Sequence, residues 1–146
     1  MMSSFTISEG SIAEVVEVSK LIAEFSNPYT EEEYVKRLQS KKHLILVAKQ
    51  NDKLIGFKVG YAKDENTFYS WMGGVLTEYR KSGVALALMQ EQEKWAKKQQ
   101  FSCIEIKTRN CFKGMLILCI KQNYLIVSVE NKENSEQNRI ILQKQI

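Results

Sequence analysis

The stretch VLTEYRKSGVA, residues 75–85, joins the end of an apolar strand to the first turn of a helix. Its small residues Ser82, Gly83 and Ala85 leave the backbone open where helical periodicity begins. The first amide groups of a helix lack partners inside the helix, and the helix dipole is positive there. With Arg80 and Lys81, such amides can cradle a pyrophosphate. A plain strand-to-helix turn with surface cations accounts for the same residues, so the pattern alone leaves both interpretations open.

Upstream of this stretch, hydrophobic spacing predicts a strand, two helices and three further strands. Capping boxes at Ser11–Glu14 and Thr30–Glu33 begin helices predicted over residues 11–26 and from residue 30 to about residue 40. Gly73-Gly74 predicts a bulge in the strand that leads into residues 75–85. The strands are predicted over residues 5–7, 44–48, 54–61 and 67–76.

Downstream, two more helices alternate with strands, and Asn123 suits the end of the second helix because asparagine tolerates left-handed backbone. The helices are predicted over residues 83–99 and 112–122, and the strands over 104–107, 124–129 and 140–142. The order β-α-α-β-β-β-α-β-α-β-β predicts an α/β (α+β) fold: a mixed, mostly antiparallel sheet flanked by helices. Without a linker or repeat, residues 1–146 are expected to form a single domain.

Composition narrows the function classes. The net charge of +4 arises from 21 basic and 17 acidic residues that are scattered along the chain, which argues against a nucleic-acid binder. There is no apolar run of membrane-spanning length, and residues 1–5 do not look like a signal peptide. Three cysteines without a CxxC pair predict a reducing, cytoplasmic location. With His43 as the single histidine, no metal site is expected.

Arg80-x-x-Gly83-x-Ala85 resembles the acetyl-CoA signature Arg/Gln-x-x-Gly-x-Gly/Ala of the GNAT superfamily of N-acetyltransferases. Residues 104–110 resemble the family's fifth strand and the asparagine after it. The helix at 112–122 with Asn123-Tyr124 resembles the family's fourth helix and its Gly-Phe ending. The resemblance covers nearly the whole chain and is strongest over residues 68–127.

The resemblance implies that acetyl-CoA donates an acetyl group to the primary amine of a small molecule or peptide by direct attack. The pyrophosphate would lie on the amides of the loop, and the pantetheine arm would pair with the strand end, in a gap where two central strands splay. A backbone N–H of Val75 or Leu76 would polarise the thioester carbonyl. The implied cofactor-binding residues are Val75, Leu76, Arg80, Lys81, Ser82, Gly83, Val84, Ala85 and Asn110.

Two positions depart from the family pattern. Cys119 stands where many members carry a tyrosine that acts as general acid, four residues before the Gly of Gly-Phe. Its thiol can in principle protonate a thiolate, but a cysteine in an apolar helix also suits an inert core. Tyr69 stands where some members carry a glutamate base; it shares a strand face with Trp71 and can instead shape the substrate pocket.

The acceptor side is expected to include Tyr29, Tyr34 and Trp71. Carboxylates near these segments favour a cationic acceptor, although the glutamates are equally explained as helix caps. On this hypothesis the basic residues lie elsewhere, at Arg80-Lys81 and Lys97-Lys98. The carboxylates are Glu31, Glu32, Glu33, Asp64 and Glu65. The expected partners are acetyl-CoA and an amine, without nucleic acid or membrane, and a homodimer stays open. The rival hypothesis is a catalytically inactive acyl-CoA-binding module of the same fold.

Overall fold

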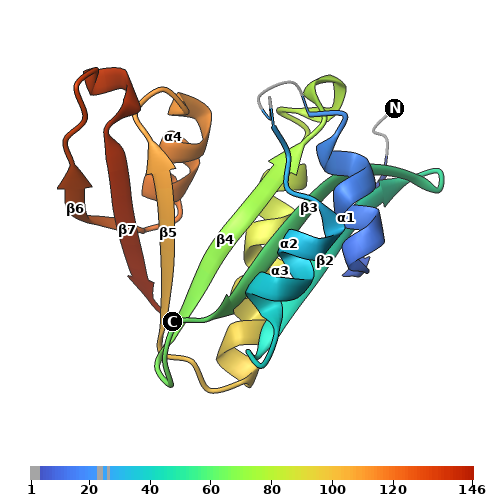
Figure 1. Cartoon of the computed structure of the whole chain (residues 1–146), viewed down its shortest axis with the longest axis horizontal. Helices are drawn as coiled ribbons and strands as arrows, with labels where there is room; N and C mark the ends of the chain where they lie inside the picture. The colour runs from blue at the N-terminus through green and yellow to red at the C-terminus, as the bar shows by residue number, and fades with distance from the viewer. Residues whose placement is uncertain (1–3, 23–24, 26) are drawn as a thin grey trace.

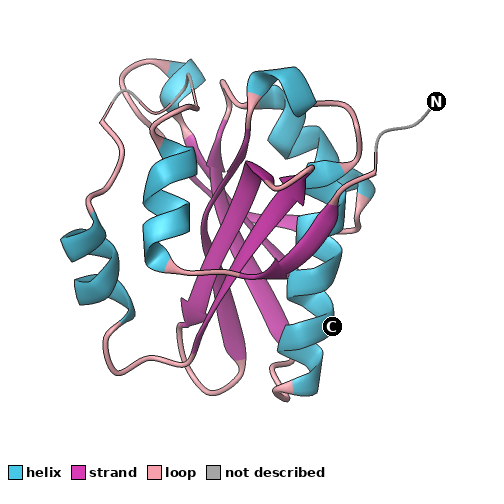
Figure 2. Ribbon diagram, turned by 90° about the vertical axis from the view of Figure 1, so that its right-hand side faces the viewer, coloured by secondary structure: helices cyan, strands magenta, loops and turns pink. Residues whose placement is uncertain are grey.

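The computed structural model describes residues 4–22, 25 and 27–146. Seven strands form one sheet in the order β1-β2-β3-β4-β5-β7-β6, and helices cover both of its faces (Figures 1 and 2). The strands are β1 (Thr6–Glu9), β2 (His43–Gln50), β3 (Lys53–Ala62), β4 (Thr67–Val75), β5 (Cys103–Arg109), β6 (Leu125–Glu130) and β7 (Arg139–Gln145). The helices are α1 (Ile12–Ser19), α2 (Glu31–Leu38), α3 (Val84–Lys98) and α4 (Lys113–Lys121). The predicted fold class and the predicted order of strands and α-helices are confirmed.

Both predicted capping boxes are present. Ser11 and Glu14 exchange hydrogen bonds of 2.9 and 3.2 Å between backbone N–H and side-chain oxygen. Thr30 and Glu33 do the same at 3.0 and 3.2 Å. These bonds satisfy N–H groups that the first turn of each helix would otherwise leave unpaired.

The helix predicted over residues 11–26 is shorter in the structure, because α1 ends at Ser19. The Ser19 hydroxyl donates to the carbonyl of Val16, and the next amides, of Leu21 and Ile22, bond three residues back rather than four. Such competing bonds tighten and end a helix. The rest of that prediction includes residues 23, 24 and 26, which lie outside the described residues.

Two hydrophobic cores lie on opposite faces of the sheet. The first packs β2 to β5 and β7 against α3 and α4, with Phe68, Leu88 and Ile104 buried in it. The second packs β2 to β4 against α1 and α2, around Val18, Tyr34 and Phe57. We call these the α3 face and the α2 face. Because side chains alternate along a strand, the central strands β2, β3 and β4 contribute to both cores.

The bulge expected at Gly73-Gly74 lies nearer the start of β4. Val59 pairs with Met72 and Gly60 pairs with Ser70, so Trp71 is the extra residue. A Cβ at Gly60 would meet the ring of Phe68 at 2.3 Å, so the ring of Phe68 in β4 packs directly against Gly60 of β3 below the bulge. An extra residue bends a strand and re-aims its side chains, and the bulge places Trp71 and Met72 together on the α2 face.

Candidate functional site

Two neighbouring strands in the middle of the sheet pair over only part of their length. β4 and β5 run parallel and pair from Thr67–Cys103 to Ser70–Ile106. Beyond this point they diverge, β4 to Val75 and β5 to Arg109, and the sheet opens as a V (Figure 1). The backbone of β4 after the bulge therefore has a partner strand on the β3 side alone.

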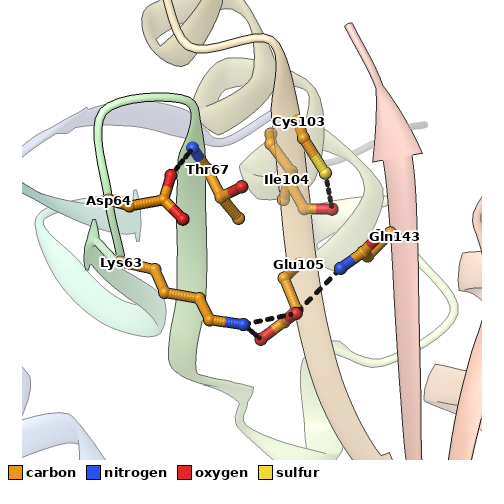
Figure 3. Close-up of polar contacts among 7 residues, drawn as sticks. All are labelled: Lys63, Asp64, Thr67, Cys103, Ile104, Glu105 and Gln143. Atoms are coloured by element: carbon orange, nitrogen blue, oxygen red, sulfur yellow. Dashed lines mark hydrogen bonds and ion pairs between the residues drawn. The ribbon is translucent and has the colours of Figure 1, made fainter.

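The closed end of the V is fastened by a buried carboxylate (Figure 3). Glu105 is 3% exposed. It accepts from Lys63 Nζ at 3.0 and 3.1 Å and from Gln143 Nε2 at 2.9 Å. Charge-assisted bonds to a buried carboxylate are among the stronger hydrogen bonds in proteins. They tie the β3–β4 turn, β5 and β7 together, so the opening is confined to the other end.

The register shows which amides of β4 face the gap. Leu76 donates its N–H to the carbonyl of Ile55 at 2.8 Å, so this amide belongs to the β3–β4 ladder. In an antiparallel ladder the bonded direction alternates from residue to residue, so Val75 and Gly73 direct N–H and C=O away from β3 and into the gap. Of the two amides suggested by the sequence, the geometry favours Val75, and it adds Gly73, which sequence reasoning missed.

The loop between β4 and α3 has the open backbone expected of an anion site. Gly83 has φ +89°, and a Cβ there would meet nothing within 4 Å. Lys81 also has positive φ, at 63°. No hydrogen bond within the described residues takes up the N–H groups of Lys81 to Ala85. These amides lie at and just before the positive end of a 15-residue helix, and the Ser82 hydroxyl donates to the carbonyl of Tyr79.

Three other residues that were predicted to bind the cofactor support the structure around the loop and the gap. Arg80 donates from Nε to the carbonyl of Val75 at 3.0 Å, which braces the loop against the end of β4. Val84 is buried under the first turn of α3. Asn110 follows β5, and its Nδ2 donates to the carbonyl of Ser135 at 3.0 Å in the loop before β7. Asn110 therefore holds the far wall of the V.

A lysine lies buried in the gap on the α3 face. Lys58 is the partner of Gly73 in the ladder and is 5% exposed. Its Nζ would be 3.6 Å from a Cβ at Gly73, so the missing side chain of that glycine makes room for it. It forms no hydrogen bond or ion pair with a described residue. Burial lowers the pKa of its amine, against the opposing influence of Cys119 and Glu93. In the sequence Lys58 looks like a solvent-exposed strand residue, so the hydrophobic pattern did not identify it as a site residue.

Cys119 lies in the α3-face core and is fully buried. Burial raises the pKa of its thiol to about 11, and Lys58 counteracts the rise. The thiol is therefore protonated at neutral pH, next to a lysine that is the stronger hydrogen-bond donor.

Replacing Cys119 with alanine should lower the free energy of unfolding by about 1 kcal/mol, because it leaves a small cavity. Turnover should stay within about threefold, since Lys58 remains in place. Urea unfolding and steady-state kinetics of the purified variant measure the two effects. A hundredfold loss of turnover with unchanged stability would instead make Cys119 the general acid.

Aromatic rings cover the α2 face beside the gap. The ring of Trp71 lies 5.3 Å from that of Tyr29 and 5.2 Å from that of Tyr34. The ring of Tyr61 lies 5.5 Å from that of Tyr69. Tyr34 is fully buried behind Trp71, whereas Tyr29 and Trp71 line a hollow of about 350 Å³. The structure thus brings the three residues predicted to bind the acceptor together. Tyr34 supports the other two from below, and Tyr29 and Trp71 lie at the surface.

The expected separation of charge is wrong. Besides Tyr29 and Trp71, the hollow is lined by Glu33, Lys36, Arg37 and Lys41, three cations against one carboxylate. Glu33 caps Thr30, and Asp64 accepts from the amides of Asn66 and Thr67 in its own turn at 2.8 Å (Figure 3 shows the bond to Thr67). Glu33 and Asp64 are thus bonded within their own local structure, and for Glu33 this is the helix cap that the alternative hypothesis gave.

Tyr69 is half-buried on the same face, and burial raises the pKa of its hydroxyl to about 12. A phenol with this pKa is protonated at neutral pH and cannot serve there as a general base. We expect Tyr69→Phe to change the catalytic rate less than tenfold and to leave the pH profile below pH 9 unmoved. The dependence of the catalytic rate on pH, recorded for both proteins with an acceptor that does not titrate in this range as control, measures this. If Tyr69→Phe removed a rise or fall of the rate near pH 7, the expectation would be contradicted.

The described part of the chain contains no cluster of three metal-binding side chains. None of its helices is long and apolar enough to cross a membrane.

The sequence and the fold were compared with those of known proteins. A sequence profile of the acetyltransferase (GNAT) family matches residues 16–116. No curated protein sequence matches the chain. The ribosomal-protein-S18-alanine N-acetyltransferase of Escherichia coli superimposes with a TM-score of 0.83 at 15% identity, over 98% of this chain and 94% of that one. Ard1 of Thermoplasma volcanium gives 0.83 at 18% identity, over 97% of both chains.

A third similar structure is a GNAT family acetyltransferase from Elizabethkingia anophelis with acetyl-CoA bound. Its TM-score is 0.77 at 21% identity, over 97% of this chain and 98% of that one. At such identities the structures establish a shared fold, and the profile match over more than half of the chain establishes the family. The chain with the split β4–β5 pair and the open loop before α3 belongs to the acetyltransferase (GNAT) family.

Proposed function

We propose that this protein transfers the acetyl group of acetyl-CoA to a primary amine of a small molecule or peptide. The observation that carries the proposal is two sets of backbone donors without a partner among the described residues, one at the gap and one in the loop that follows it. Gly73 and Val75 face the gap, and the amides of Lys81 to Ala85 lie open beyond it. Together the two sets suit a ligand with an extended amide arm and a pyrophosphate at one end.

The residues present fit acetyl-CoA. The loop amides would take the pyrophosphate, where Gly83 leaves space that a side chain would fill. Arg80 braces the loop, and Lys81 adds positive charge at its exposed surface. The edge of β4 after the bulge would take the pantetheine arm as an added strand. Acetyl-CoA supplies a thioester, and transfer forms an amide bond to the acceptor nitrogen while the C–S bond breaks and a thiol leaves.

Lys58 lies beside Gly73, and its amine and the Gly73 N–H that faces the gap would together stabilise negative charge. Charge develops first on the thioester oxygen and then on the leaving sulfur. Preorganised N–H donors in a site shielded from water contribute strongly to such reactions. Lys58 carries N–H donors whether or not its amine is protonated, so we assign to it the hydrogen bond that a hydroxyl acid on α4 would otherwise supply. The acceptor amine would enter from the α2 face, past Trp71.

The rival function is an acyl-CoA-binding module without catalysis. The observation that favours it is the buried, protonated thiol of Cys119 at the position of the expected acid. Calorimetry with acetyl-CoA, followed by a thiol assay with and without amines, separates the two. The transferase binds acetyl-CoA and releases thiol in an amine-dependent way, whereas the binding module binds and releases none. We further propose that the chain acts as one cytoplasmic domain, which fits its three free cysteines.

A further inference from the structure

We propose that the acceptor carries a negatively charged group, a carboxylate or phosphate, close to its reacting amine. This inference rests on the proposed transfer to an amine and names the class of amine. It follows from cations that approach the aromatic face of β4 from both sides of the V, from α2 on one side and from β5 and β7 on the other.

The α2 wall presents an ordered guanidinium. Arg37 donates from Nη1 to the hydroxyl of Tyr61 at 3.1 Å, and its Cζ lies 4.7 Å from the centre of the Trp71 ring. Stacking on an aromatic face while keeping further N–H donors is the arrangement in which arginine binds carboxylate or phosphate. Lys41 lies 4.5 Å over the Tyr61 ring, and Lys36 completes the basic rim of the 350 Å³ hollow.

The opposite wall is also basic. Lys107 of β5 places Nζ 5.3 Å from the centre of the Tyr69 ring. Arg139 of β7 and Arg37 both favour the ionised form of Tyr69, which places the two arginines within electrostatic reach of its hydroxyl. Cations from three elements thus converge on two neighbouring side chains of β4, Tyr69 and Trp71.

Three carboxylates of this region have other partners. Glu33 accepts from the N–H and hydroxyl of Thr30. Glu105 is held by Lys63 and Gln143. Glu130 lies 3.9 Å from both Lys132 and Arg139. None of these carboxylates forms an ion pair with Arg37, Lys41 or Lys107 within the described residues. An anionic group on the acceptor would supply the missing countercharge and orient the amine toward the gap.

Matched acceptor pairs test this directly. We would compare Gly-Asp amide with Gly-Asn amide, glycine with glycinamide, and phosphoethanolamine with ethanolamine, each corrected for its fraction of neutral amine. The anionic member should have the higher kcat/KM, on the order of tenfold, and added salt should shrink the difference. The three pairs distinguish a side-chain carboxylate, an α-carboxylate and a phosphate.

Variants show which residues cause the preference for the anionic acceptor. Arg37→Met should bring the ratio of kcat/KM within the preferred pair toward one, while Arg37→Lys should keep most of the preference. Lys107→Met should reduce the ratio from the opposite wall. Lys98→Met, at the exposed end of α3, is the control for loss of one positive charge and should change nothing. Affinity for acetyl-CoA should be the same in all four variants.

Faster turnover of the neutral member in every pair would overturn the anionic acceptor and leave acetyl transfer standing. Preference for the anion that survives both Arg37→Met and Lys107→Met would also overturn it, because the preference would then arise elsewhere. If no amine supports thiol release although acetyl-CoA binds, the proposed function itself fails, and this inference fails with it.

Discussion

Replacing Lys58 with methionine should slow acetyl transfer by about 100- to 1,000-fold, the usual loss on removing one donor that stabilises developing charge. The same substitution should stabilise the fold by about 1 to 3 kcal/mol, since a buried amine without an ion pair among the described residues gives way to an apolar side chain of similar length. Steady-state kinetics and urea unfolding measure the two effects. Few core substitutions raise stability while abolishing activity, so the pair of results is diagnostic.

The loss should appear in kcat rather than in the affinity for acetyl-CoA, because the donor acts chiefly when charge develops. Lys94→Met, on the exposed face of α3, is the control for a lysine lost outside the gap. A Lys58→Met enzyme within tenfold of the wild-type rate would remove Lys58 from the mechanism.

Stability as a function of pH provides a second view of Lys58. Its pKa is lower in the folded protein than in the unfolded chain, so between the two values the unfolded chain binds more protons. Wild-type protein should therefore gain stability relative to Lys58→Met as pH rises toward about 10.4, the ordinary lysine value. A constant difference across the alkaline range would mean that Lys58 is not buried in the way the structure describes.

Gly83→Asp should weaken acetyl-CoA binding at least about a hundredfold, whereas Gly83→Asn should weaken it less than about tenfold. The two side chains have nearly the same shape, and both residue types tolerate positive φ better than most. Any strain at φ +89° is thus matched in the pair. The remaining difference is one negative charge beside a pyrophosphate, worth several kcal/mol at short range. Calorimetry on both variants, after a check that they unfold alike, gives the comparison.

Equal affinities for Gly83→Asp and Gly83→Asn would mean that no phosphate lies near the start of α3. The loop would then be a plain turn, which is the alternative that the sequence left open.

Elements with a strong local signal were predictable from the sequence. Both capping boxes began helices where expected, and Asn123 ends α4 in left-handed conformation with φ 72°. Strand and helix order followed from hydrophobic period alone. The bulge was misplaced because Gly73-Gly74 is the visible break in the sequence, while the extra residue is Trp71. A bulge depends on register with β3, which no local pattern of β4 contains.

In the candidate site too, residues with a local sequence signal were predictable and residues brought together by folding were not. The loop at Gly83 has a local signature, so the sequence alone identified it as a candidate site, and the structure shows open backbone there. Lys58 and Gly73 come together only through strand pairing, 15 residues apart by number, and a buried lysine looks no different from a solvated one in sequence. The charge around the predicted acceptor-binding residues was misjudged for a related reason. Arg37, Lys107 and Arg139 are far apart along the chain, and folding gathers them around Tyr69 and Trp71.

The central claim is amine-dependent release of coenzyme A from acetyl-CoA. We would incubate purified protein with acetyl-CoA and the matched acceptor pairs, follow free thiol over time, and identify the acetylated amine by mass spectrometry. The account predicts thiol release that requires an amine, equals the amount of N-acetyl product, and falls at least about a hundredfold in Lys58→Met. Tight binding of acetyl-CoA with no product from any amine would contradict it and leave an acyl-CoA-binding protein.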